Sequence, residues 1–236
     1  MARDLTGKPV STFPDRARAR DLAHINAWIF DLDNTLYPAS ANLFAQIDKR
    51  MKAFIANALN MTPEDAFVLQ KQYYHKHGTT LRGLMINHDV DPNAFLDYVH
   101  DIDHSVLSAD AKLDQALRVL PGRKFIYTNG SAYHARSVME RLGVAHHFAS
   151  VYDIHASNYI PKPDPAPYVE MVTKHTIDPS RAVMFEDSHH NLKPAADMGM
   201  TTVWVRHAES RVAPDDDLSH CHYTTEDLVG WLAGKR

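Results

Sequence analysis

The sequence contains one cysteine, Cys221, and no long hydrophobic run. A single cysteine excludes an intrachain disulfide, which fits a reduced compartment, and we expect the protein in the cytoplasm. No apolar stretch approaches the roughly 20 residues that a membrane-spanning helix needs. The N-terminus also lacks the apolar core of a signal peptide. We therefore expect no membrane partner.

Long runs of positive charge are also missing. The formal net charge is −4, which argues against a nucleic acid polymer as the main partner. The small basic cluster of Arg16, Arg18 and Arg20 is explained most simply as a solvated tail or first helical turn. The 16 histidines show no HExxH or other metal-ligand spacing, so we expect most of them at the surface or in loops.

The composition is that of a globular protein, with 44% hydrophobic and 23% charged residues in a chain of 236. This length is enough for one α/β core and an inserted helical unit. Apolar runs predict strands at 26–31, 124–128, 150–154, 181–185 and 201–205, and periodic segments predict helices at 132–142, 165–175, 192–198 and 225–233. Strands that alternate with helices at this spacing predict an α/β fold with a doubly wound parallel sheet.

The stretch from 41 to 120 has a different pattern. Apolar residues recur there at three- and four-residue spacing, which predicts helices at 43–58, 67–77, 93–102 and 111–120. Thr62-Pro63-Glu64-Asp65 has the hydroxyl cap, proline and acids typical of a helix start. We therefore expect residues 1–40 and 121–236 to form the α/β core, with 41–120 inserted as an all-helical cap domain.

Four predicted strand ends carry polar groups. Asp31 and Asp33 follow the first strand, and residues two apart on an extended backbone point the same way. Both can reach a site at the carboxyl end of the sheet, where open α/β sheets bind ligands. Thr128-Asn129-Gly130-Ser131 follows the second strand and opens a helix, whose N-terminus attracts anions.

The remaining two groups are Lys162, which lies between two prolines, and Glu186-Asp187, which follows the strand at 181–185. Carboxylates at a strand end can hold a hard cation such as Mg²⁺. Taken singly, each group has an ordinary explanation as a turn, a loop lysine or a helix cap. Their joint occurrence in this order, each at a strand end, makes coincidence a poor explanation.

This ordered set resembles the four motifs of the haloacid dehalogenase superfamily, over about residues 26–206. Asp31-x-Asp33-x-Thr35 is similar to the first motif, Thr128 to the second, Lys162 to the third and Glu186-Asp187 to the fourth. The helical insert after the first motif matches the superfamily's C1 cap class. The dehalogenase branch lacks the second aspartate, because a halide leaves without a proton, so Asp33 favours phosphate chemistry.

The resemblance implies a role for each motif residue. Asp31 is expected to attack phosphorus and form an aspartyl-phosphate, and Asp33 to protonate the leaving oxygen and then activate water. Thr128, Asn129 and Gly130 are expected to hold the phosphoryl oxygens, and Lys162 to neutralise charge. Mg²⁺ is the expected cofactor, and its ligands are the Asp31 and Asp187 carboxylates and the Asp33 carbonyl. Glu186 is either a ligand or a group that orients metal-bound water.

A narrower resemblance points to the pyrimidine 5′-nucleotidase branch. It lies in the run from Asp31 to Pro38 and in the cap segment from His77 to Leu84. It implies a small phosphorylated partner, UMP or CMP, and a monomer or homodimer. Cap residues are then expected to recognise the leaving group, and Arg82 is the main candidate among Asn42, Phe44, Tyr73, Thr79, Arg82 and Met85. A surface salt bridge for Arg82, and cap-core packing for Phe44 and Tyr73, are the ordinary alternatives.

Other functions stay open at this level. Another small-molecule phosphatase, for phosphoglycolate or a sugar phosphate, would carry the same motifs, because the site and not the fold sets the substrate. A phospho-accepting receiver also combines acids, a hydroxyl residue and a lysine on a parallel sheet, but the long cap and Asp33 argue against it. The full set of charged groups argues against a non-catalytic binding protein. His189 and His190 are expected on a solvent-facing first helical turn, outside the site.

Overall fold

A computed structural model describes residues 22–208, 210 and 212–234. The basic cluster of Arg16, Arg18 and Arg20 lies outside the described residues, as do residues 209, 211, 235 and 236. None of the described helices is both long enough and apolar enough to cross a membrane.

Within the described chain, six parallel strands form one sheet in the order β3-β2-β1-β4-β5-β6. The strands are β1 (Ala27–Phe30), β2 (Arg123–Tyr127), β3 (Phe148–Tyr152), β4 (Ala182–Glu186), β5 (Thr201–Val205) and β6 (Tyr223–Thr225). The first five were predicted to within a few residues, and the short edge strand β6 was not. This sheet with its flanking helices confirms the predicted doubly wound α/β fold.

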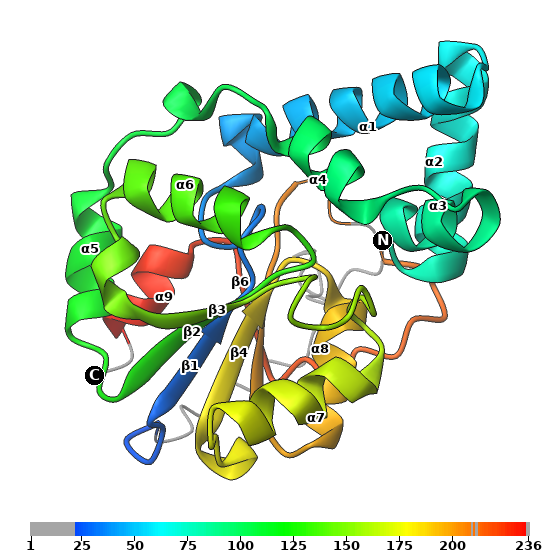
Figure 1. Cartoon of the computed structure of the whole chain (residues 1–236). Coiled ribbons are helices and arrows are strands. Elements are labelled where there is room, and N and C mark those ends of the chain that lie inside the picture. The colour runs from blue at the N-terminus through cyan, green and yellow to red at the C-terminus, as the bar shows by residue number, and fades with distance from the viewer. Residues whose placement is uncertain (1–21, 209, 211, 235–236) are drawn as a thin grey trace, which may run out of the picture.

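Helices cover both faces of the sheet (Figure 1). The helices that follow the cap are α5 (Ala111–Arg118), α6 (Ala132–Leu142), α7 (Pro165–Lys174), α8 (His189–Asp197) and α9 (Leu228–Gly234). Because side chains alternate along a strand, Trp28 and Phe30 pack with α5, α6 and α9, whereas Ala27 and Ile29 pack with α7 and α8. Burial on both faces explains why these strands are continuous apolar runs.

Four helices of the predicted cap pack around a third apolar cluster: α1 (Leu43–Leu59), α2 (Pro63–His77), α3 (Thr80–His88) and α4 (Pro92–His100). Helix α2 begins where the predicted Thr62 cap placed it, since the Thr62 side chain accepts the backbone N–H of Asp65. Helix α3 was not among the predicted helices. Four short 3₁₀ turns complete the described elements: Ala39–Ala41, His104–Val106, Ala145–His147 and Pro179–Arg181.

The α5 helix was predicted as part of the cap, but it packs elsewhere. Leu113, Ala116 and Leu117 belong to the cluster on the sheet, and α5 contacts α9. We therefore retain the two-part division as a proposal and place its second boundary before α5, near the 3₁₀ turn His104–Val106 (Figure 1).

Strand β1 lies between β2 and β4, with Phe30 paired to Ile126 on one side and to Phe185 on the other. The chain winds outward in opposite directions on the two sides of β1, so a topological switch point lies at its carboxyl end. Crevices at such points are where open α/β sheets place their ligands. The cap is inserted directly after this strand end.

Candidate active site

The predicted strand-end residues converge at the switch point. Asp31 follows β1, Thr128 follows β2 and Glu186 ends β4. Lys162 was also predicted at a strand end, but it lies in the loop between β3 and α7, well after Tyr152, the last residue of β3. All four line one cavity of about 440 Å³ under the cap. The fold therefore brings together four motifs that lie far apart in the sequence.

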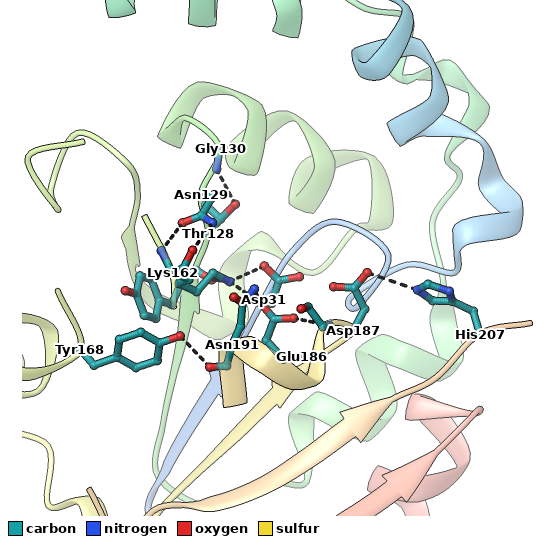
Figure 2. Close-up of polar contacts among 12 residues, drawn as sticks. Asp31, Thr128, Asn129, Gly130, Lys162, Tyr168, Glu186, Asp187, Asn191 and His207 are labelled. Atoms are coloured by element: carbon teal, nitrogen blue, oxygen red, sulfur yellow. Dashed lines mark hydrogen bonds and ion pairs between the residues drawn. The ribbon is translucent and has the colours of Figure 1, made fainter. Parts of the chain in front are cut away.

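Lys162 lies at the centre of this convergence. Its Nζ donates to Asp31 Oδ1 at 2.7 Å and to Glu186 Oε1 at 2.8 Å, and also to the carbonyl oxygen of Tyr127 at 2.9 Å (Figure 2). The side chain is almost fully buried, with 2% of the residue exposed. Three oxygen acceptors satisfy the three ammonium donors, which is what burial of a lysine requires.

Burial also sets the charge state of this group. It raises the pKa of Asp31 to about 7, against the attraction of Lys162, and Glu186 adds repulsion. It likewise raises the pKa of Glu186 to about 7, again opposed by Lys162 and reinforced by Asp187. Burial disfavours the Lys162 ammonium, but the two carboxylates outweigh it and raise its pKa. Burial and the repulsion between neighbouring carboxylates therefore disfavour the charged forms of Asp31 and Glu186, and a bound cation would offset this.

Asn129 makes contacts that the sequence did not indicate. Its Oδ1 accepts the Lys162 backbone N–H at 2.9 Å, and its Nδ2 donates to the Lys162 carbonyl at 3.4 Å. Its amide thus fixes the loop that delivers Lys162. Nearby, Thr128 Oγ1 accepts the Gly130 N–H at 2.9 Å, and all three residues of this predicted phosphate cradle line the cavity.

Glu186 is engaged on both oxygens. Oε1 accepts Asn191 Nδ2 at 2.6 Å in addition to Lys162, and Oε2 accepts the Ser188 N–H at 2.7 Å. Tyr168 in turn donates to the Asn191 carbonyl at 2.6 Å (Figure 2). These bonds hold Glu186 in one orientation.

Asp187 is less constrained. Its backbone carbonyl accepts Trp204 Nε1 at 2.9 Å, and its Oδ2 lies 3.2 Å from His207 Nε2 (Figure 2). The carboxylates of Asp31, Glu186 and Asp187 offer oxygens that all lie within 4.8 Å of one another. An all-oxygen donor set with surplus negative charge fits a hard divalent cation such as Mg²⁺.

Asp33 lies beside this group and makes contacts that the sequence did not indicate. Its Oδ1 accepts the Tyr37 hydroxyl at 2.6 Å and His134 Nε2 at 2.8 Å. Burial opposes ionisation of Asp33, but His134 and Tyr37 outweigh it and hold the pKa of the carboxyl below its usual value. The one sequence signal for His134 was its place in the first turn of the helix that follows Thr128.

The cap wall differs from the expected set of substrate residues. Phe44 and Thr79 line the cavity, but Tyr73 packs inside the cap and hydrogen-bonds His88. Asn42 is exposed and bonds the Ser40 carbonyl. The structure does not bring Arg82 to the cavity lining, nor Met85, which packs against the cap cluster.

Other cap residues form that wall instead. Tyr74, one residue beyond Tyr73, faces the cavity because successive helical residues point about 100° apart. Gln70 and Lys71 both donate to Asp48 Oδ1, at 2.9 and 2.6 Å. The apolar and polar residues of α2 do not repeat regularly enough for the sequence to show which positions face the cavity and which face the cap core.

His189 and His190 do open helix α8, as predicted. His190 is exposed, but His189 is buried, with Nε2 3.3 Å from Asp216. The expectation of two solvent-facing histidines is therefore wrong for His189, because the loop that contains Asp216 covers it.

Comparisons with known proteins agree with this geometry. Phosphate metabolism protein 8 of Saccharomyces cerevisiae (strain ATCC 204508 / S288c) is 27% identical over 205 residues, which cover 79% of this chain and 61% of that protein. The chain therefore spans less than two thirds of this curated relative.

Solved structures share the fold. A HAD phosphatase from Thermococcus onnurineus matches with a TM-score of 0.56 and 19% identity, over 85% of this chain and 93% of that one. An L-2-haloacid dehalogenase from Xanthobacter autotrophicus, with chloropropionic acid covalently bound, matches with a TM-score of 0.56 and 14% identity, over 89% and 97%. At these identities the likeness shows the fold alone. The sequence profile of the haloacid dehalogenase-like hydrolases matches residues 25–199, most of the chain, and the protein belongs to that family of hydrolases.

Proposed function

We propose that this hydrolase is a Mg²⁺-dependent phosphatase of small phosphomonoesters, and that its substrates are the pyrimidine nucleotides UMP and CMP. The observation that carries the proposal is the Lys162 ammonium held between Asp31 and Glu186, with the second carboxylate, Asp33, beside them. This arrangement offers a nucleophile, a charge-neutralising group and a proton donor within one cavity.

The proposed reaction has two steps. In the first, an Asp31 oxygen bonds to phosphorus while the bond to the leaving oxygen breaks. Asp33, which must first take up a proton because His134 and Tyr37 lower its pKa, gives that proton to the leaving oxygen. In the second, water bonds to phosphorus, the Asp31–phosphorus bond breaks, and Asp33 takes the proton from water. Splitting the displacement in this way replaces one difficult step by two easier ones.

The other residues hold the phosphoryl group and its charge. Lys162 offsets negative charge that develops during transfer, and the Thr128 hydroxyl with the backbone N–H of Asn129 offers hydrogen bonds to the phosphoryl oxygens. We propose that Asp31, Asp187 and the Asp33 carbonyl would hold Mg²⁺, with Glu186 orienting Lys162. When bound, the ion neutralises charge between two anionic reactants.

The cap residues that line the cavity fit a leaving group that has polar atoms and a flat apolar part. Phe44 and Phe95 contribute apolar surface, whereas Asp48, Gln70 and Lys71 contribute donors and acceptors. The Gln70 Oε1 atom is buried with no hydrogen-bond partner among the described residues, and Gln70 is only 2% exposed. A nucleobase amide or imino N–H would satisfy such an acceptor. Arg82 stays a proposed substrate residue.

Asp33 also bears on the choice between phosphate and halide chemistry. A halide leaves without a proton, whereas an alkoxide needs one, and Asp33 is half-buried at the site with its own hydrogen-bond partners. The name of the yeast relative, which refers to phosphate metabolism, agrees with phosphate as the reacting group. We further propose a cytoplasmic enzyme that acts as a monomer or homodimer.

The test is phosphate release from a panel that contains UMP, CMP, dTMP, AMP, GMP, phosphoglycolate and sugar phosphates, with Mg²⁺ and with EDTA. We expect Mg²⁺-dependent, multiple-turnover release with UMP and CMP preferred. A preference for purine nucleotides or for non-nucleotides would favour the alternative of another small-molecule phosphatase. A single stoichiometric phosphorylation without steady release would favour a receiver-like module, and halide release from haloacids alone would overturn phosphatase chemistry.

A further inference from the structure

The Asp33 carboxylate is held by one of its two oxygens. Both the Tyr37 hydroxyl and His134 Nε2 bond to Oδ1, at 2.6 and 2.8 Å. Among the described residues we find no hydrogen bond to Oδ2. Since Asp33 lines the cavity, Oδ2 is the oxygen that remains for proton exchange with a bound substrate.

The backbone and the ring of His134 both make specific contacts. It is 0% exposed and lies in the first turn of α6, where its backbone N–H donates to Ser131 Oγ. Its ring lies flat against His100, with centroids 4.6 Å apart and planes 5° apart. Its Nδ1 lies 3.2 Å from His104 Nε2, in the chain that joins the cap to the core.

These partners define the tautomer. Asp33 Oδ1 can only accept from His134, so His134 Nε2 carries a hydrogen. In a neutral imidazole the other nitrogen, Nδ1, is then an acceptor, and His104 Nε2–H is the donor beside it. Both nitrogens of a fully buried ring are thus paired, and one of the two bonds ends on the aspartate that would transfer the proton.

We propose that His134 is a positioning residue that, with Tyr37, clamps Asp33 by Oδ1 and so directs Oδ2 at the leaving oxygen and then at water. The inference rests on the proposed phosphatase function, because it concerns the proton-transfer group of that reaction. A carboxylate free to rotate about its side-chain bonds would present Oδ2 in the productive direction for only part of the time. The clamp removes that freedom before the substrate binds.

The test uses the dependence of the rate on the leaving group. A nucleoside 5′-alkoxide needs a proton to leave, whereas p-nitrophenolate does not. We therefore expect His134→Leu to lower kcat/KM for UMP by about 30-fold or more, and for p-nitrophenyl phosphate by less than about 3-fold. Where another alkyl phosphate is the best substrate of the panel, that compound replaces UMP. His134→Gln, whose amide N–H can reach the position of Nε2, is expected to restore most of the UMP rate.

His147→Leu is the matched control. His147 Nε2 makes the same kind of bond, to Asp114 Oδ1 at 2.8 Å, and neither residue lines the cavity. This variant is expected to lower Tm without changing the ratio of the two kcat/KM values. If His134→Leu does not fold, Tyr37→Phe removes the other donor to Oδ1 while keeping a buried ring, and the ratio is expected to change in the same direction.

Equal losses on both substrates, or an unchanged ratio in His134→Leu and in Tyr37→Phe, would overturn the clamp and leave His134 as a packing residue. Those outcomes presuppose a wild-type protein that hydrolyses phosphomonoesters. A wild-type protein that hydrolyses none would instead overturn the proposed function, and the inference with it.

Discussion

Lys162 has acceptors for all three of its ammonium hydrogens, and two of them are carboxylates from different strands. At the scale of the residue, this contact holds Asp31 and Glu186 together although burial raises the pKa of both. Removing a single member of such a buried group leaves a charge without its partner, which costs more than the pair contributes. Substitutions that keep the shape of each side chain are therefore the informative ones.

Asp31→Asn tests the nucleophile. We expect turnover to fall by at least about 10⁴-fold, because an amide oxygen cannot form the covalent intermediate. The fold is expected to persist, since the amide oxygen of the new side chain can still accept from Lys162. Phosphate release and thermal denaturation measure the two effects, and substantial turnover by a folded variant would exclude Asp31 as the nucleophile.

The variants Asp187→Asn and Glu186→Gln test which of the two carboxylates binds Mg²⁺ directly. In the wild type, Mg²⁺ at 100 times its Kd is expected to add about 2.7 kcal/mol to the free energy of unfolding. We expect Asp187→Asn to lose most of this gain and Glu186→Gln to keep most of it, because the Glu186 oxygens already accept three hydrogen bonds.

Denaturation with and without Mg²⁺ gives the gain for each variant. A loss in Glu186→Gln as large as that in Asp187→Asn would make Glu186 a direct ligand of the ion.

His100 gives the pH dependence at this scale. Burial, reinforced by His134, His104 and His155 and opposed by Asp33, lowers the pKa of His100 to about 3 from an ordinary value of 6.5. Below pH 6.5, His100 therefore takes up a proton in the unfolded chain but stays neutral in the folded chain. The contribution of His100 to stability is complete above that pH and is lost as the pH falls.

Relative to His100→Phe, which cannot titrate, the wild type is expected to lose about 2 kcal/mol of unfolding free energy between pH 7.5 and pH 5. Urea denaturation of both proteins at the two pH values measures the difference. A constant gap between wild type and variant would show that His100 titrates normally in the folded protein.

At the scale of the element, helix α3 approaches α2 closely because Gly83 lacks a side chain. A Cβ added there would lie 2.3 Å from Cγ and 2.4 Å from Cβ of Tyr73. These atoms are near the backbone of α2 and cannot swing away as the end of a long side chain could. The same close packing holds Tyr73 in the cap core and leaves Tyr74 to the cavity.

We expect Gly83→Ala to lower the unfolding free energy by about 1–3 kcal/mol through overpacking, although alanine is the better helix former. Chemical denaturation measures the change. Ile86→Ala, at an exposed position of the same helix, is the control and is expected to have little effect. A Gly83→Ala protein as stable as the wild type would show that the two helices can separate without cost.

At the scale of the whole molecule, the cap covers a cavity whose reactive residues come from the carboxyl end of the sheet. We expect Gln70→Leu to raise KM for UMP much more than for p-nitrophenyl phosphate, because its buried Oε1 has no partner among the described residues. Arg82→Ala, outside the cavity lining, tests the residue proposed from the sequence. Equal changes on both substrates for a variant would mean that its residue does not recognise the base.

The sequence was enough to predict most of the core. Buried strands such as β1 and β4 are continuous apolar runs, and helices such as α6 end at a glycine, so pattern and turn residues fixed their type and order. It was not enough for α3, whose sequence is only weakly amphipathic and contains Gly83, or for β6, a three-residue edge strand. It also placed α5 in the cap, because the periodicity of an amphipathic helix does not indicate which apolar surface the helix covers.

For the site, the sequence by itself determined which residues stand at the strand ends, since parallel strands bring their carboxyl ends to one edge of the sheet. Only the tertiary structure decided that His134 clamps Asp33, that Asn129 binds the Lys162 backbone, and that Tyr74 faces the cavity while Tyr73 does not. The physical reason is that strand periodicity is local and visible in the chain. The direction of a helical side chain, by contrast, and its contact with a residue 101 positions away depend on how whole elements pack.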